Sequence, residues 1–417
     1  MRSALAAFVG SVLILSFALF SASCRKNSQL VAPPDTAHFL TKQQHEISWP
    51  GLANSPWPMF LHDAQHTGRS PYRGPQEGKV EWTFFAGGGV FSSPVIDENG
   101  TIYVRVSSFS PDFLAIGADG QLKWSKSTAG DGSALVAADG NVHVDGYDNW
   151  QRYLFAYDRG GFLKWRFPVV GNASFSSPVI SKDGGTVYLA VGSLYAIRRD
   201  GTLHWKWKPD SDSVQYSPAM SPDGTLLYVP GGHALYAVDT SGHLRLTCRK
   251  VPSAPAVDND GNVYFCAGAD ELCSFDQSGV LRWRLPGVPW TGLGIGPIIG
   301  WDGTIYVITC LDLYAIDYAG RLKWKYPLPA LSDCIPAIDV DGTIYFGLTH
   351  SRRPYGNPAD STNFIALNPD GTMKFQMYLA GGLGGWIPNI DSPPAISGNG
   401  RIYVSSNNPG HHVYAIK

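Results

Sequence analysis

The sequence lacks an excess of charge of either sign. Its 417 residues include 32 Lys and Arg against 34 Asp and Glu, which gives a formal net charge of −2. A surface so balanced produces no long-range field that would steer the chain toward nucleic acid or anionic lipid. We therefore expect no nucleic-acid partner.

Cysteine is also scarce, with six residues and no adjacent pair. One of them, Cys24, belongs to the N-terminal leader, and the other five cannot all pair within the chain. An exported protein can form disulfides, and Cys266 and Cys273 flank a predicted hairpin, but isolated buried thiols fit the spacing equally well. The five cysteines are Cys248, Cys266, Cys273, Cys310 and Cys334.

Glycine and aromatic residues are abundant. The chain has 47 Gly, 20 Tyr and 13 Trp, and 44% of its residues are hydrophobic. This content is enough for a large core, and the glycines and aromatics indicate many turns that separate short aromatic strands. The composition therefore predicts an all-β chain.

The N-terminus has the features of a secretory signal. Arg2 precedes an apolar run over 4–20, and small residues follow at 21–23. We predict that residues 1–23 are a signal peptide. Small residues before a cysteine resemble a bacterial lipobox, in which Cys24 becomes the lipidated first residue, although leucine is preferred three residues before it. Two alternatives are an ordinary cleavage site and retention of the run, which is short for a membrane span, as an anchor.

Residues 24–55 are predicted to be a flexible tether that begins with the lipidated Cys24. They are polar, contain proline and show no clear period. Such a composition does not bury enough apolar surface to fold by itself. The tether would join the lipid anchor to a folded body over residues 56–417.

A repeat with a period of about 40 residues organises that body. Each unit opens with a strand like Ser-Pro-Val-Ile, turns at Asp-Gly or Asn-Gly, and continues like Thr-Ile-Tyr-Val. A variable loop, a strand like Leu-Tyr-Ala-Ile-Asp, a second glycine turn and a strand ending in Leu-Lys-Trp follow. Eight openings place a proline, or alanine in the second unit, six residues before the turn glycine: Pro94, Ala134, Pro178, Pro218, Pro255, Pro297, Pro336 and Pro394.

Only seven closing strands follow the eight openings. Their characteristic position holds Trp124, Trp165, Trp205, Leu246, Trp283, Trp324 and Phe375. The last unit stops at Lys417 without a closing strand, whereas residues 78–82 carry the missing pattern ahead of the first unit. We predict a single eight-bladed β-propeller of four-stranded antiparallel blades, in which this N-terminal strand completes the C-terminal blade and the closing aromatics lock neighbouring blades. A linear solenoid would leave two large apolar ends uncapped.

Residues 313–324 resemble the tryptophan-docking motif of PQQ-type propellers, and related copies lie at 114–124 and 155–165. Residues 57–71 resemble the lead segment of the same family. The resemblance extends over nearly all of 57–417 and implies the propeller fold. The family includes quinoprotein alcohol dehydrogenases and BamB-like outer-membrane assembly lipoproteins, and the size and layout here resemble the second group, which has a lipid anchor, eight blades and no cofactor.

The dehydrogenases of this family are longer and carry calcium ligands, a catalytic Asp and a disulfide between adjacent cysteines. None of these can be placed on matching positions here, so we predict no catalytic residue, no cofactor and no metal site. PQQ and calcium enter only under the alternative of a dehydrogenase with an atypical site.

Two patterns suggest metal ligands and have simpler explanations. The turns at 258–261 and 339–342 are rich in Asp, as calcium loops are, but they are too short and recur as ordinary Asp-Gly turns. His62 and His66 are four residues apart, which would suit zinc on a helix, but no third ligand is evident and packing in the lead segment explains them.

Loop lengths are asymmetric and predict a recognition face. In each blade the first and third turns are short, whereas the other two connections vary and emerge together on the opposite face. These loops cover 109–113, 147–150, 289–292, 350–363 and 381–386. The alternative is that their aromatics plug the mouth of the channel. The candidate binding residues are Tyr147, Trp150, Trp290, Arg352, Arg353, Tyr355 and Trp386.

These features predict a non-catalytic binding or scaffolding lipoprotein that is exported to the bacterial cell envelope, lipid-anchored and periplasm-facing. Its partner would be an envelope protein, a peptide or a polysaccharide, and the resemblance implies a role in outer-membrane protein assembly. The alternatives are a PQQ-dependent dehydrogenase and a carbohydrate-binding propeller.

Overall fold

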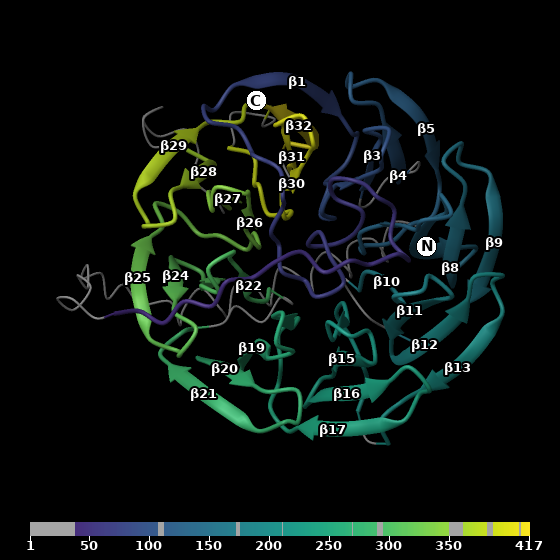
Figure 1. Cartoon of the computed structure of the whole chain (residues 1–417). Helices are drawn as coiled ribbons and strands as arrows, with labels where there is room; N and C mark the ends of the chain where they lie inside the picture. The colour runs from purple at the N-terminus through teal and green to yellow at the C-terminus, as the bar shows by residue number, and fades with distance from the viewer. Residues whose placement is uncertain are drawn as a thin grey trace, which may run out of the picture.

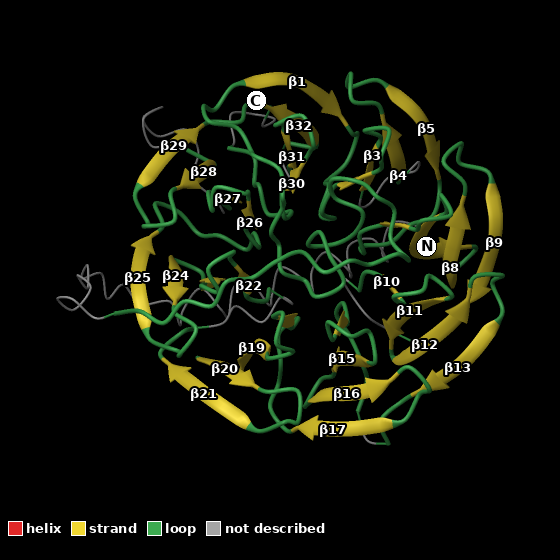
Figure 2. Cartoon of the chain, in the orientation of Figure 1, coloured by secondary structure: helices red, strands yellow, loops and turns green. Residues whose placement is uncertain are grey.

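A computed structural model describes residues 38–106, 112–171, 176–210, 212–268, 270–289, 295–349, 362–381, 387–407 and 410–417. Within these ranges the chain contains β-strands and no helix (Figure 2). The strands form eight four-stranded antiparallel sheets that stand as blades around one axis (Figure 1). The predicted all-β, eight-bladed propeller is confirmed.

Blades are numbered in chain order, and the strands of each run from the axis outward. Blades one to four consist of β2 (Val95–Ile96), β3 (Ile102–Arg105), β4 (Phe113–Ile116) and β5 (Leu122–Lys126); β6 (Leu135–Val136), β7 (Val142–Asp148), β8 (Gln151–Tyr157) and β9 (Leu163–Pro168); β10 (Val179–Ile180), β11 (Thr186–Val191), β12 (Ser193–Arg198) and β13 (Leu203–Trp207); and β14 (Ala219–Met220), β15 (Leu226–Pro230), β16 (Leu235–Asp239) and β17 (Leu244–Cys248).

The remaining blades repeat this order. They consist of β18 (Ala256–Val257), β19 (Val263–Ala267), β20 (Glu271–Phe275) and β21 (Leu281–Pro286); β22 (Ile298–Ile299), β23 (Ile305–Ile308), β24 (Asp312–Ile316) and β25 (Leu322–Pro327); β26 (Ala337–Ile338), β27 (Ile344–Gly347), β28 (Phe364–Leu367) and β29 (Met373–Met377); and β30 (Ala395–Ile396), β31 (Ile402–Ser405), β32 (His412–Ile416) and the outermost β1 (Val80–Phe85).

The turn between the first two strands of a blade shows why the repeat folds this way. In blade one, Asp97 Oδ1 accepts hydrogen bonds from the backbone N–H groups of Asn99 at 2.9 Å and Thr101 at 2.8 Å. Gly100 takes a left-handed φ of 76°, which glycine adopts without strain. The strand that follows is buried along its whole length, because each blade packs between two neighbours.

The first and last strands of the chain close the ring. β1 pairs antiparallel with β32, so that Val80 lies opposite Ile416 and Thr83 opposite Tyr414. Lys79 and Lys417 extend the pairing with two backbone hydrogen bonds of 3.1 and 2.8 Å. The predicted closure is confirmed, and it gives an edge strand to the C-terminal blade.

Closing tryptophans lock six blades to their neighbours. The indole N–H of Trp82 donates to the carbonyl of Ala118 at 3.1 Å, and that of Trp124 donates to the carbonyl of Arg159 at 2.8 Å. The ring covers a turn glycine of the next blade so closely that a Cβ on Gly120 would lie 2.8 Å from the Trp82 ring. The predicted locking by the closing aromatics is therefore confirmed at these interfaces.

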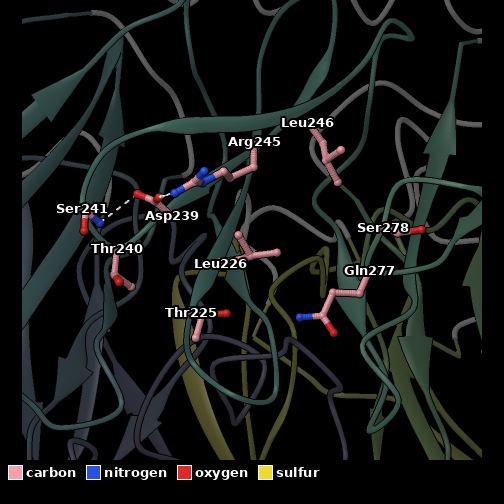
Figure 3. Close-up of a pocket in the computed structure, with 9 residues that line it drawn as sticks. All are labelled: Thr225, Leu226, Asp239, Thr240, Ser241, Arg245, Leu246, Gln277 and Ser278. Carbon is pink, nitrogen blue, oxygen red and sulfur yellow. Dashed lines mark hydrogen bonds and ion pairs between the residues drawn. The ribbon is translucent and has the colours of Figure 1, made fainter.

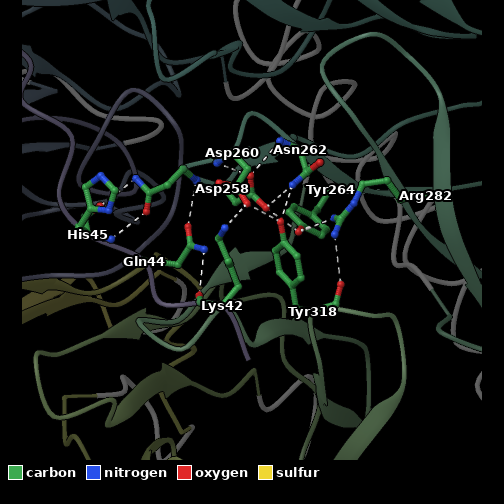
Figure 4. Close-up of polar contacts among 10 residues, drawn as sticks. Lys42, Gln44, His45, Asp258, Asp260, Asn262, Tyr264, Arg282 and Tyr318 are labelled. Carbon is green, nitrogen blue, oxygen red and sulfur yellow. Dashed lines mark hydrogen bonds and ion pairs between the residues drawn. The ribbon is translucent and has the colours of Figure 1, made fainter. Parts of the chain in front are cut away.

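The N-terminal segment departs from the prediction of a flexible tether over 24–55. From residue 38 onward it lies on the short-turn face, where Lys42 pairs with Asp260 at 2.9 Å and Gln44 accepts from the backbone of Asn259 at 2.9 Å (Figure 4). Trp49, only 8% exposed, donates to the carbonyl of Ile180 at 2.9 Å. This strap is polar but finds partners in the turns of successive blades, so it is ordered against the ring.

The strap continues inward and fills the short-turn end of the channel. Residues 57–70 donate or accept backbone hydrogen bonds along the innermost strands, including Ile96 N–H to Trp57 O at 2.8 Å and Val257 N–H to Gln65 O at 2.9 Å. Trp57 and Met59 are fully buried among the inner strands. Residues 57–70, which we call the plug, therefore make one face of the propeller solid.

Cysteines do not cross-link the hairpin that two of them flank. Cys266 lies opposite Leu272 and Cys273 opposite Phe265, and the two thiols belong to apolar clusters on opposite faces of blade five. Cys248, Cys266, Cys273 and Cys334 are free thiols. Burial raises the pKa of Cys266 to about 12, which makes its thiol unreactive at neutral pH.

Candidate recognition face

The face opposite the plug, which we call the long-loop face, carries a projecting hairpin. Strands β7 and β8 are seven residues each and stay paired from Val142–Tyr157 to Asp148–Gln151. Their two-residue turn places Asn149 and Trp150 at left-handed φ values of 49° and 68°, the combination that continues the right-handed twist of a hairpin. The hairpin therefore extends from blade two as a regular ribbon.

The tip of this hairpin exposes two of the predicted binding residues. Trp150 is 93% exposed and Tyr147 is 38% exposed. The guanidinium of Arg152 lies 5.5 Å from the centre of the Tyr147 ring, and Arg166 pairs with Asp148 while lying over Tyr153 at 4.6 Å. Aromatic and arginine side chains so arranged are typical of residues that dominate binding energy in protein interfaces.

A buried ion pair supports the hairpin from below. Arg152 donates to Asp145 Oδ2 through Nε at 3.1 Å and through Nη2, and both side chains are almost fully buried. Both residues lie on the hairpin itself as diagonal neighbours on its two strands, since Asp145 is opposite Leu154 and Arg152 is opposite Tyr147. A buried pair costs desolvation but fixes side-chain geometry, so it holds the base of the ribbon in one arrangement.

Arg105 forms a second buried charge beside the hairpin. It is 1% exposed and donates to the carbonyl of Thr128, to the Thr128 hydroxyl at 3.1 Å and to the carbonyl of Gly130 at 3.4 Å. Asp112 accepts from the backbone of Thr128 at 2.6 Å, and burial raises the pKa of its carboxyl. Arg105 therefore ties blade one to the loop that leads into blade two.

Three aspartates occupy equivalent positions at the inner rim of this face. Asp131, Asp333 and Asp391 each stand three residues before the alanine or proline that opens an innermost strand. Burial raises the pKa of Asp333 to about 6 and that of Asp391 well above the usual value, where the charge of Asp333 adds to the effect, whereas Asp131 is exposed. The rim is therefore less negative at mildly acidic pH.

Asp391 is only partly satisfied. Its Oδ2 accepts from the amide of Asn407, whereas its Oδ1 is buried and has no hydrogen-bond partner among the described residues. An unpaired buried oxygen disfavours the ionised carboxylate, which agrees with the raised pKa of Asp391.

Arg105, Arg152, Asp145 and the three rim aspartates are not among the residues predicted from the sequence. Comparing the units position by position carries a signal for the rim, because other units have Phe91 or Gln215 where the aspartates stand. It carries none for the buried arginines, since arginine side chains are usually exposed.

Five of the seven predicted binding residues fall outside the described ranges. The structure brings Tyr147 and Trp150 together on one hairpin, and it does not describe the loops that hold the others or the predicted signal peptide and lipidation site. The residues outside the described ranges are Cys24, Trp290, Arg352, Arg353, Tyr355 and Trp386.

The residues of the two patterns that suggested metal ligands contact other groups of the protein. Asp258 accepts from two backbone N–H groups of its turn, from the amide of Asn262 at 2.8 Å and from the hydroxyl of Tyr264 at 2.8 Å (Figure 4). His62 and His66 lie in the plug with left-handed φ values rather than on a helix. Their rings pack edge-on against Trp57 and Phe60.

No metal-ligand set or membrane-spanning helix occurs in the part of the chain that the structure describes. No three His, Cys, Asp or Glu side chains gather in these ranges as a metal site would require. The same residues contain no helix with the length and hydrophobicity needed to cross a bilayer.

Comparisons with known proteins agree with this architecture. The crystal structure of BamB from Moraxella catarrhalis is similar to this chain with a TM-score of 0.58 and 15% identity, over 82% of this chain and 97% of that one. At this identity the likeness shows the fold alone. No curated protein matches the sequence.

A family match is more specific. The sequence model described as outer membrane protein assembly factor BamB matches residues 73–208 and 191–335, which together are more than half of the chain. Both matches lie in the repeats that form the ring. The chain therefore belongs to the BamB family of PQQ-like β-propellers.

Proposed function

We propose that this protein is a non-catalytic envelope lipoprotein that binds a protein partner through its long-loop face during outer-membrane protein assembly. The observation that carries the proposal is the projecting hairpin of blade two, whose tip exposes Trp150 on a ribbon fixed by the buried Arg152–Asp145 pair. A large aromatic held at low entropic cost on a rigid support is the usual centre of a binding hot spot. The family match supports the assembly role.

The geometry also explains why this face, rather than the other, would bind the partner. The short-turn face is covered in part by the strap and filled by the plug. On the long-loop face, variable connections stand on a rigid ring, which is where propellers and other repeat scaffolds place recognition residues. A peptide or polysaccharide partner remains an outcome of the test.

Cross-linking from two positions of the same blade tests the proposal. A photo-reactive phenylalanine analogue at Trp150 should capture a discrete outer-membrane assembly protein in intact envelopes. The same analogue at Phe162, which is 73% exposed on the short-turn face of blade two, is the matched control. Equal capture from both positions, or none from position 150, would contradict the proposal.

The anchor is tested separately. We expect Cys24→Ser to move the protein from the membrane fraction to the soluble periplasmic fraction, because lipidation requires the thiol. The ring should keep its thermal stability, since Cys24 precedes the folded body. If the variant stays with the membrane, Cys24 is not the anchor.

A further inference from the structure

One blade interface departs from the tryptophan lock. Six interfaces place an indole on the next blade, through Trp82, Trp124, Trp165, Trp205, Trp283 and Trp324. A seventh places Phe375 against Gly78. Between blades four and five the position holds Leu246, which has neither a second ring nor an N–H donor.

The filled interfaces show what the position accepts. In each, the indole N–H donates to the carbonyl two residues before a turn glycine, as from Trp205 to Thr240 at 2.9 Å. The ring also lies against an aromatic side chain of its own blade's second strand, as Trp205 does against Tyr188 at 5.8 Å. The receiving groups are thus a carbonyl, a glycine and an aromatic ring.

The interface between blades four and five keeps all three receiving groups. Gly279 has the same left-handed φ, 84°, and the carbonyl two residues before it, that of Gln277, accepts no hydrogen bond from the described residues. Tyr228 stands in the register of Tyr188, but no aromatic ring of the described chain lies against it. Its buried hydroxyl also has no partner among those residues.

A groove of about 490 Å³ opens beside this position, between Leu246 and Gln277 (Figure 3). Tyr228, in the apolar cluster against which Leu246 packs, is not part of its lining. Leu246 covers Gly279 and shares the lining with Leu226, and Thr225, Thr240 and Gln277 supply polar atoms. The charges in the lining are those of Arg245 and Asp239, which are paired through Nε and Oδ2 at 2.8 Å. Such a lining suits a neutral aromatic group with one hydrogen-bond donor better than it suits an anion.

From these features we infer that the groove binds the indole side chain of a tryptophan presented by a partner polypeptide. The ring would lie beside Leu246 and Leu226, and its N–H would donate to the carbonyl of Gln277, as the protein's own indoles do at six other interfaces. The groove is formed by short turns, so it lies away from the long-loop face and is a second contact, independent of the proposed function.

The test uses N-acetyl-tryptophanamide as the probe and the folded mature protein as the receptor. Ligand-observed NMR should show saturable binding in about the millimolar range, because one side chain buries little area. Leu246→Trp, which fills the groove from within, should weaken binding at least 10-fold. Leu203→Trp, at an exposed position of the neighbouring outer strand, is the matched control and should leave binding unchanged.

Two further measurements keep the result clear even if Leu246→Trp folds poorly. In the wild type, titration should shift the amide signals of Gln277 and Gly279. The 1-methylindole analogue of the probe, which lacks the N–H, should bind at least 5-fold more weakly. Absence of probe binding, unchanged binding by Leu246→Trp, or binding of glucose in place of the probe would overturn the inference.

Discussion

Aspartates on the two faces of the propeller have pKa shifts of opposite direction. On the short-turn face, aspartates accept hydrogen bonds from side chains and backbone N–H groups of their own turns, which lowers the pKa of Asp276 and Asp370. On the long-loop face, burial raises the pKa of Asp333 and Asp391. The first arrangement is repeated from blade to blade, whereas the second occurs in only some of the blades that the structure describes.

The features that repeat in the blades build the fold, whereas features that occur in one blade are additions to it. Repeated turns and docked indoles hold the ring together, and the strap and plug complete it. The single features, such as the Arg152–Asp145 pair and the exposed Trp150, contribute to one blade only. Substitutions on the two faces should therefore separate stability from binding.

The largest effect is expected in the plug. Trp57→Ala should lower the free energy of unfolding by about 3–5 kcal/mol, because it leaves a large cavity among fully buried inner strands. Denaturant titration followed by circular dichroism measures it. Trp57→Phe is the control and should cost much less, since the indole nitrogen of Trp57 has no hydrogen-bond partner in the described structure. Equal losses for both variants would show that the plug does not pack as described.

The next effect should come from the base of the hairpin. Arg152→Ala should cost about 3–5 kcal/mol, because it leaves the Asp145 carboxylate buried without its partner. Arg166→Ala removes the partly exposed pair with Asp148 and should cost less than about 1 kcal/mol. Adding Asp145→Leu to Arg152→Met should recover much of the loss. Similar costs for the two arginines would contradict the difference in burial.

A smaller effect concerns pH. Because the pKa of Asp333 is raised to about 6 in the folded state, the folded protein binds more protons than the unfolded chain between about pH 4 and 6. The contribution of Asp333 to the free energy of unfolding therefore falls as pH rises from about 4 to 6. Asp333→Asn should gain about 1 kcal/mol at pH 7, less than the full shift implies because the side chain is partly exposed, and should gain nothing near pH 4. A gain that is the same at both pH values would contradict the raised pKa.

The smallest effect on stability is expected at the hairpin tip. Trp150→Ala should change the free energy of unfolding by no more than about 0.5 kcal/mol, since the side chain is almost fully exposed. Co-purification of the partner captured from this position should nevertheless drop sharply. A variant that loses stability but keeps its partner would reverse the roles assigned to the two faces.

Sequence predicted the features that repeat. The spacing of Pro94 and Gly100 recurs in the other units and predicts the inner hairpins, and the pattern at 78–82 predicts the pairing of Val80 with Ile416. Features that occur once gave no such signal. The strap looks like a tether because its partners, such as Asp260 and Ile180, lie far away in sequence.

Recognition by the long-loop face stays a prediction, whereas the shared position of two of its residues is observed. Loop asymmetry placed Tyr147 and Trp150 correctly on one face, because alternate connections of a meander emerge on the same side. The buried Arg105, Arg152 and Asp145 could not be expected, because their burial depends on how blades one and two meet. Only an indirect sign of the groove is present in the sequence, because Leu246 stands where the other units have an aromatic residue.

The pairing of β1 with β32 has a consequence for biogenesis. A chain is synthesised from its N-terminus, so β1 is made early and has no partner until the final five-residue strand, β32, follows. During that interval a seven-bladed intermediate exposes two open strand edges, which are sites where other chains can pair and aggregate. A chain shortened by only its last few residues would keep seven complete blades but lack the β1–β32 pairing that closes the ring. The ring can therefore close only after the C-terminal strand has been made, and native stability depends on that last strand.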